Sequence, residues 1–255
     1  MSKLKISIIT VSLNSQSTIR QTIESVRSQS YKNIEYILID GGSTDWTLEI
    51  INDLIDNIDY FKTESDNGIY DAMNKGISIA SGDIIGILNS DDFYDNPNVI
   101  EDVVRIFESK KCDSLYGDLV YVKASNALDV VRYWQSGNFK KEKLKNGWTL
   151  PHPTFFVKKS IYNKYGLYNT KLKTAADYEM IIRLLFKHNI SVEYLPKILV
   201  HMRTGGISNA SLKHRFIANK EDGLAWKFNH LYQPMFVRIQ KPFQKIVQFF
   251  KKPIS

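Results

Sequence analysis

The sequence has almost no cysteine, and Cys112 is the single thiol among 255 residues. One thiol cannot form a disulfide within the chain and has no cysteine partner for a thiolate zinc site, so we expect a reducing compartment, the cytoplasm. No run of about 18 apolar residues occurs, which argues against a membrane-spanning helix. The first residues lack the long apolar region and cleavage site of a signal peptide, so no secretion signal is expected.

The charge balance is positive, with a formal net charge of +7 at pH 7. Positive potential favours nucleic acid, anionic membranes and phosphate-bearing substrates alike. Residues 236–255 contain five Lys or Arg residues, no Asp or Glu, and several Phe, Ile and Val residues. This tail suits a segment lying on an anionic bilayer as well as a helix docked on the core. We expect no nucleic-acid binding, because the basic surplus lies in this aromatic tail and no nucleic-acid motif is present.

Hydrophobic residues make up 43% of the chain, enough for one large core. Short β-branched runs alternate with segments of helical periodicity from residue 5 to about 108. The predicted strands are 5–11, 34–39, 58–63 and 84–88, and the predicted helices are 17–29, 48–55 and 70–80. This alternation predicts an α/β fold with a doubly wound, mostly parallel sheet, helices on both faces and a ligand crevice at the carboxyl ends of the strands.

The second half is less regular. The pattern there predicts strands near 114–122, 154–158 and 192–195 and a helix over 177–187. The polar stretch 123–147 is interpreted as a linker-like segment that can form a mobile loop.

Asp91 and Asp92 follow the predicted strand 84–88 directly. Adjacent carboxylates at such a crevice can hold Mg²⁺ or Mn²⁺ against a diphosphate, because hard cations prefer oxygen ligands. The alternative is a helix cap, since Asn96 and Pro97 begin a helix shortly afterwards. Considered alone, the pair supports both interpretations equally.

Polar residues also follow the second and third predicted strands. Asp40 can accept a hydrogen bond from a nucleoside, although the residues alone favour an Asp-Gly turn with Ser43 or Asp45 as a helix cap. Asp66 and Lys75 lie around the next polar cluster. Lys75 can pair with a phosphate, but the simpler interpretation is a solvated helix lysine.

A reaction in which a hydroxyl oxygen attacks needs a general base to take the hydroxyl proton. Asp177, at the start of an apolar helix, is our candidate for such a base. From spacing alone, an ordinary helix N-cap is the favoured interpretation of Asp177. His152 and His201 can contact a diphosphate, a metal or an acceptor, but a lone histidine is more often a packed or surface residue.

Together these residues resemble glycosyltransferase family 2, the inverting enzymes with the GT-A fold, over about residues 4–210. The segments that carry the resemblance are ISIITVSLN (6–14), YILIDGGSTD (36–45), DNGIYDAMNKG (66–76) and LNSDD (88–92). Their order and their positions at predicted strand ends make the resemblance specific.

The resemblance implies a set of site residues. The expected nucleotide-sugar-binding residues are Thr10, Ser12, Asp40, Asp66, Lys75, Asn89, Ser90 and Asp91. Asp91 and Asp92 correspond to the metal site, with Mn²⁺ or Mg²⁺ as the cofactor, and Asp177 matches the catalytic base. The family's fuller acidic pattern, Asp-x-Asp-Asp, begins here with Asn89, to which no metal ligation is assigned.

The resemblance also implies a domain organisation. We expect a GT-A catalytic domain over 1–210, with a nucleotide-binding half of about 1–110 and an acceptor-binding half of about 111–210. Residues 211–255 are expected to form a helical, basic-aromatic appendage. The segments 152–154 and 205–208 are expected near the acceptor.

The implied function is inverting transfer of a sugar from a nucleotide diphosphate sugar to a carbohydrate or polyprenyl-linked saccharide during bacterial surface polysaccharide synthesis. The expected location is the cytoplasm, with a peripheral contact at the inner face of the membrane; a homo-oligomer stays open. The alternatives are a nucleotidyltransferase, and a non-catalytic sugar-nucleotide-binding or membrane-scaffold protein. The sequence leaves the donor sugar and the acceptor undetermined.

Overall fold

The computed structural model describes residues 3–205 and 212–234, and for residues 212–218 it describes the backbone alone. The strands are β1 (Ile6–Ser12), β2 (Ile34–Asp40), β3 (Tyr60–Thr63), β4 (Ile84–Ile87), β5 (Asp92–Tyr94), β6 (Ser114–Lys123), β7 (Asn126–Trp134), β8 (Phe156–Lys158) and β9 (Val192–Arg203). The α-helices are α1 (Ile19–Arg27), α2 (Thr47–Asp53), α3 (Ile69–Ile79), α4 (Val99–Lys110), α5 (Lys141–Lys145), α6 (Lys159–Tyr165), α7 (Ala176–Ile181) and α8 (Leu212–Phe228). Short 3₁₀ turns are η1 (Ile55–Asn57) and η2 (His152–Thr154), and η3 (Ile182–Lys187) is a π-helix.

One sheet runs through the described part of the chain in the order β3-β2-β1-β4-β8-β6-β9-β5, with β7 added beside β6. β1 pairs in parallel with β2 and β4, and β2 pairs in parallel with β3. β8 is antiparallel to its neighbours, whereas β6 and β9 are again parallel. The predicted α/β, mostly parallel sheet is confirmed, and the carboxyl ends of β1 to β4 share one edge.

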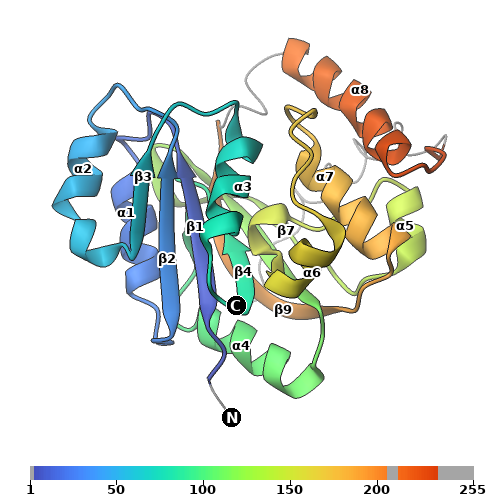
Figure 1. Ribbon diagram of the computed structural model, residues 1–255, viewed down its shortest axis with the longest axis horizontal. Helices are drawn as coiled ribbons and strands as arrows, with labels where there is room; N and C mark the ends of the chain where they lie inside the picture. Colours follow the sequence, from blue (N-terminus) through green and yellow to red (C-terminus); the bar gives the residue numbers. More distant parts are fainter. Residues whose placement is uncertain (1–2, 206–211, 235–255) are drawn as a thin grey trace.

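Helices cover both faces of the sheet, as Figure 1 shows. On one face, α1, α2 and α4 bury side chains such as Ile23, Ile51 and Val103 against the even-numbered residues of β1. On the other face, α3, α6 and α7 pack against Ile9 and its neighbours. α3 approaches β1 very closely at Gly76, where an added Cβ would overlap the Ile9 side chain. The two cores therefore hold the polar strand ends in fixed positions.

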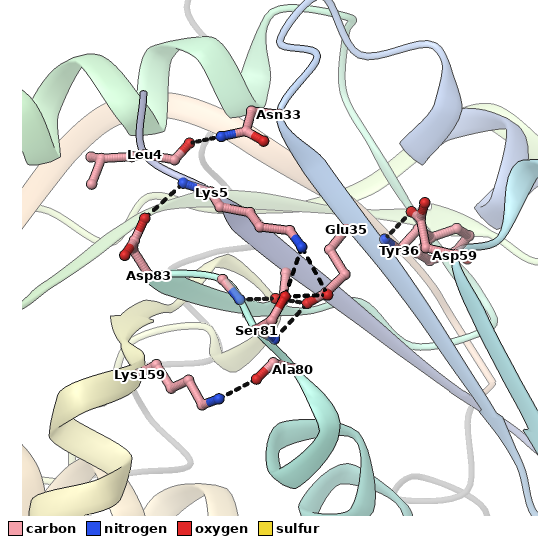
Figure 2. Close-up of polar contacts among 12 residues, drawn as sticks. Leu4, Lys5, Asn33, Glu35, Tyr36, Asp59, Ala80, Ser81, Asp83 and Lys159 are labelled. Atoms are coloured by element: carbon pink, nitrogen blue, oxygen red, sulfur yellow. Dashed lines mark hydrogen bonds and ion pairs between the residues drawn. The ribbon is translucent and has the colours of Figure 1, made fainter. Parts of the chain in front are cut away.

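A polar cluster joins the starts of β1, β2 and β4 (Figure 2). Glu35 accepts hydrogen bonds from the Ser7 and Ser81 hydroxyls and from the Ser81 backbone N–H, and it pairs with Lys5 at 3.0 Å. Burial would raise the pKa of Glu35, but these hydrogen bonds outweigh it and lower the pKa to about 2. Lys159 donates to the Ala80 carbonyl beside this cluster. The cluster thus fixes the sheet at the edge opposite to the strand ends.

The interpretation of residues 123–147 as a linker is wrong. β7 pairs with β6 in an antiparallel ladder from Lys123 to Leu119, and α5 follows. Among the described residues no strand pairs with the other side of β7, and most of its side chains lie at least partly in solvent. The sequence of such an edge strand shows no continuous apolar run, because half or less of the strand is buried.

Two further elements differ from the sequence prediction. β9 extends over twelve residues rather than four, and the predicted helix 177–187 divides into α7 and η3. No helix within the described residues is long and apolar enough to cross a membrane. The basic-aromatic tail 236–255 and the acceptor segment 206–208 lie outside the described residues.

Candidate active site

Asp40 lies at the end of β2 and joins the ends of three strands. Its Oδ1 accepts hydrogen bonds from the hydroxyls of Ser12 (2.9 Å) and Ser43 (2.5 Å). Its Oδ2 accepts from the Thr63 hydroxyl (2.8 Å) and from the backbone N–H groups of Gly42 and Ser43. Burial would raise the pKa of Asp40, but the hydrogen bonds from Ser43, Thr63 and Ser12 lower it. Asp40 is therefore a buried anion that organises the strand ends, and its contact with a nucleoside stays a prediction.

Asp66 lies beside the end of β1, close to Ser12. Its Oδ1 accepts from the Gly68 N–H at 2.8 Å, and its Oδ2 faces Gly41 so closely that a Cβ on Gly41 would overlap it. Gly41 itself donates to the Ser12 carbonyl at 2.8 Å. The missing side chain of Gly41 leaves room for the Asp66 carboxylate to lie against this backbone position. The predicted pair Ser12 and Asp66 is thus brought together.

Thr10 and Lys75 have partners within the protein. Thr10 is fully buried, and its hydroxyl accepts from the Tyr36 hydroxyl at 3.1 Å in the core on the α1 side. Lys75 forms ion pairs with Glu64 (3.1 Å) and Asp71 (3.2 Å). The structure thus places Thr10 two residues before the end of β1, and it places the Lys75 charge among carboxylates.

The loop between β4 and β5 carries Asn89, Ser90, Asp91 and Asp92. Asp92 is fully buried, and Asn89 Nδ2 donates to its Oδ2 at 3.1 Å. Asp92 Oδ1 and Asn89 Oδ1 are buried and have no hydrogen-bond partner among the residues that the structure describes. Burial, followed by the neighbouring Asp91, raises the pKa of Asp92 well above its usual value. Burial also raises the pKa of Asp91, and the Arg203 charge opposes this rise.

This loop is attached to α1 and β9. The Thr22 hydroxyl donates to the Ser90 and Asp92 carbonyls (2.9 and 2.7 Å), and the Ser15 and Ser90 hydroxyls lie 2.7 Å apart. Arg203 donates to the Asp91 carbonyl at 2.5 Å. The loop therefore lies beside the end of β1, where Ser12 and Asp66 are also found.

The residues of this loop fit a divalent cation. The described residues contain no group of three or more His, Cys, Asp or Glu side chains that could hold a metal. Mg²⁺ and similar ions, however, commonly take one or two protein carboxylates and complete their shell with water and substrate phosphates. Asp91 and Asp92 provide such carboxylates, and Asp92 Oδ1 is a hard acceptor to which no group in the described part of the chain donates.

Asp177 lies in the first turn of α7 and belongs to an aromatic cluster. Tyr70 donates from its hydroxyl to Asp177 Oδ1 at 3.1 Å, and the Tyr70 and Tyr168 rings stack at 5.6 Å. Burial and the Asp177 charge raise the pKa of Tyr70 well above its usual value, so the phenol stays protonated and donates. The Tyr168 hydroxyl lies 2.5 Å from His152 Nε2. The structure thus brings together two predicted residues, Asp177 and His152.

His152 is partly buried, and desolvation lowers its pKa although the Asp177 charge opposes this. Its imidazole is therefore neutral at pH 7. Sequence reasoning missed Tyr70, Tyr168 and Asn74, which holds the Tyr168 backbone through two hydrogen bonds of 2.9 Å. Tyr70 and Asn74 lie in the segment 66–76 that carries the family resemblance, and this was the available signal.

His201 lies apart from this cluster, in the ladder between β5 and β9. Its Nε2 is 2.6 Å from Asp95 Oδ1, and its ring stacks on Phe93 at 4.9 Å. Burial would raise the pKa of Asp95, but the hydrogen bond with His201 lowers it. A cavity of about 130 Å³ near the start of β2 holds none of the predicted site residues.

The sequence pattern of the family described as Glycosyl transferase family 2 matches residues 7–166, which is more than half of the chain. The chain belongs to glycosyl transferase family 2. An uncharacterized glycosyltransferase of Mycobacterium tuberculosis is 35% identical over 180 residues, covering 70% of this chain and 68% of that protein. A PGL/p-HBAD biosynthesis glycosyltransferase of Mycobacterium bovis is 27% identical, covering 83% and 82%. Family membership makes this protein a glycosyltransferase and disfavours the nucleotidyltransferase alternative.

Solved structures place this family 2 glycosyltransferase in the GT-A fold. S. aureus TarS 1-349 in complex with UDP-GlcNAc superimposes with a TM-score of 0.69 at 16% identity, over 89% of this chain and 65% of that one. The chain thus spans slightly less than two thirds of that TarS fragment. The mannosyltransferase PcManGT from Pyrobaculum calidifontis, in complex with GDP-Man and Mn²⁺, gives 0.62 at 12% identity, over 100% and 77%.

Proposed function

We propose that this glycosyltransferase transfers one sugar, with inversion, from a nucleotide diphosphate sugar to a saccharide or lipid-linked saccharide acceptor. The observation that carries the proposal is the environment of Asp177. Its Oδ1 accepts from Tyr70, so Oδ2 is the oxygen that can take a proton from an acceptor hydroxyl. A neutral His152 lies behind the same cluster, bonded to Tyr168.

The donor binds, in this proposal, where Ser12, Asp66 and the loop 89–92 meet. The ends of parallel strands are the usual ligand crevice of an α/β sheet. The TarS structure holds UDP-GlcNAc and the mannosyltransferase holds GDP-Man, so nucleotide sugars of both kinds are reasonable probes. Asp91 and Asp92 hold a divalent cation, Mn²⁺ or Mg²⁺, which when bound offsets charge on the departing nucleoside diphosphate.

Attack by the acceptor oxygen on the anomeric carbon in one displacement inverts its configuration. Asp177 accepts the hydroxyl proton while the bond to the nucleoside diphosphate breaks. The M. bovis relative is named for PGL/p-HBAD biosynthesis, which supports an acceptor in a bacterial glycolipid or surface glycan. A non-catalytic scaffold, by contrast, would bind the donor without releasing nucleoside diphosphate.

The direct test is Asp177→Asn, which keeps the side-chain shape but removes the proton acceptor. We expect this variant to bind UDP-GlcNAc or GDP-mannose as the wild type does, and to lose about 10²–10⁴-fold in nucleoside diphosphate release. The measurement is coupled detection of released UDP or GDP over a panel of simple glycoside acceptors. Near-normal turnover by Asp177→Asn would overturn the base assignment.

A further inference from the structure

The last helix of the described residues, α8, packs against α7, which carries the proposed base in its first turn (Figure 1). Ala225 and Trp226 of α8 form a buried cluster with Ala175, Tyr178 and Ile182 around α7. Glu221 of α8 and Asn229, the residue after α8, are also buried, so this part of the chain presents both apolar and polar groups to α7. The predicted boundary at residue 210 thus separates two helices that are in direct contact.

Glu221 holds the segment that leads into α7. Its carboxylate accepts the Lys173 N–H (3.0 and 3.1 Å), the Thr174 N–H (2.7 Å) and the Thr174 hydroxyl (2.8 Å). The residue is 8% exposed, so these bonds form away from bulk water. Hydrogen bonds to a carboxylate are stronger than neutral ones, and losing such a buried acceptor leaves two backbone donors unsatisfied. Thr174 lies three residues before Asp177.

α8 also holds the residues on the other side of Asp177. Trp226 Nε1 donates to the Tyr178 hydroxyl at 3.2 Å. Asn229 Nδ2 donates to Glu179 Oε1 at 2.9 Å. Asp177 therefore lies between contacts at positions 174 and 178, made by α8, and a contact at position 179, made by the residue that follows α8. A shift in the position of α8 relative to α7 must therefore move the turn that carries Asp177.

We propose that Glu221 is a positioning residue for the transfer reaction, acting through Asp177. By fixing residues 173 and 174, it sets the direction in which the Asp177 carboxylate meets Tyr70 and the acceptor. A displacement of about 1 Å in a catalytic group can cost roughly 10²-fold in rate, so a small shift of this turn is sufficient. The inference rests on the proposed role of Asp177 as the base.

The test is Glu221→Gln, which places an amide NH₂ group near the backbone donors of residues 173 and 174. We expect kcat to fall by about 10- to 100-fold. The affinity for UDP-GlcNAc or GDP-mannose should stay unchanged, because the residues proposed to bind the nucleotide sugar lie on other elements. The matched control is Asp102→Asn, since Asp102 on α4 is also 8% exposed and pairs with Lys197. That control should lower the melting temperature and leave kcat unchanged.

A double-mutant comparison separates positioning from folding. If Glu221 acts through Asp177, adding Glu221→Gln to Asp177→Asn should cause no further loss of residual turnover. An equal loss in both backgrounds would overturn the inference, as would a wild-type kcat for Glu221→Gln. Turnover retained by Asp177→Asn alone would instead refute the proposed base.

Should Glu221→Gln fail to fold, Thr174→Val is the second variant, because it removes only the hydroxyl that donates to Glu221. Thr174→Val should also lower kcat, and an unchanged kcat for this variant would overturn the inference.

Discussion

Asp40 and Asp177 are two aspartates for which the sequence alone favoured a local structural role. Asp40 does accept the N–H groups of Gly42 and Ser43, as an Asp-Gly turn requires. Asp177 makes no side-chain cap on α7 and instead meets Tyr70, more than one hundred residues away. Spacing cannot distinguish these cases, because the contact that decides each one is formed by the folded chain.

Gly41 allows a direct test of Asp66 in donor binding. Gly41 does not adopt a left-handed backbone conformation, so Gly41→Ala should leave the fold intact and only displace the Asp66 carboxylate, which the new Cβ would overlap. We expect about a tenfold loss or more in affinity for the nucleotide sugar, with a stability change of at most about 1 kcal/mol. Calorimetric titration and thermal unfolding measure both quantities. Asp66→Ala is the matched variant, and unchanged affinity in both would exclude Asp66 from the donor site.

β1, β2 and β4 were predicted to within about two residues, because they are apolar, mostly β-branched runs that the sheet buries along most of their length. β1 is buried along its whole length, for example. β7 and most of β9 were missed for the opposite reason: their partly exposed, mixed composition has no clear period. The pairing that makes them strands comes from β6, which the sequence cannot show. β3 was also predicted to within two residues, although it is mostly exposed, and β5 was not predicted.

The candidate site also contains residues that the sequence could indicate and residues that it could not. Residues near the ends of predicted strands, such as Asp40, Asp66 and Asp91, could be singled out from the sequence because polar clusters end apolar runs, and their roles stay predictions. Tyr168 and Glu221 were missed, since their partners lie in other elements and their own neighbours in sequence form no motif. His201 is an example of a residue that the sequence grouped with His152 and that the fold places elsewhere.

The polar cluster at the starts of β1, β2 and β4 should make the stability of the protein depend on pH. Glu35 has a folded pKa of about 2, below the ordinary value of 4.5, so its contribution is complete above pH 4.5 and is lost as the pH falls towards 2. Glu35→Gln should therefore lower the free energy of unfolding at pH 7 by about 1–3 kcal/mol, and by less at pH 3. Urea unfolding at both pH values measures this. Asp53→Asn, in an exposed pair with Arg20, should have little effect at either pH; a pH-independent loss for Glu35→Gln would contradict the account.

At the scale of the molecule, one sheet runs through the described part of the chain and connects the regions that we propose bind the donor and the acceptor. β1, β2 and β4 end beside Ser12, Asp66 and the loop 89–92, while η2 before β8 carries His152 and α7 after β8 carries Asp177. α3 links the two, because Asp66 precedes it and Tyr70 lies in its first turn. Carboxylates far apart in the sequence therefore lie along one side of a continuous sheet, which supports a single site for donor and acceptor.

The most direct test of this account is titration of UDP-GlcNAc and GDP-mannose, with and without Mn²⁺, into the wild type and Asp92→Asn. The wild type should bind one of these donors more tightly in the presence of Mn²⁺. Asp92→Asn should lose about 10- to 100-fold of that affinity in Mn²⁺ and little in its absence, as expected when a ligand of the metal is removed. Equal, Mn²⁺-independent binding by both proteins would contradict a metal and nucleotide sugar site at the strand ends.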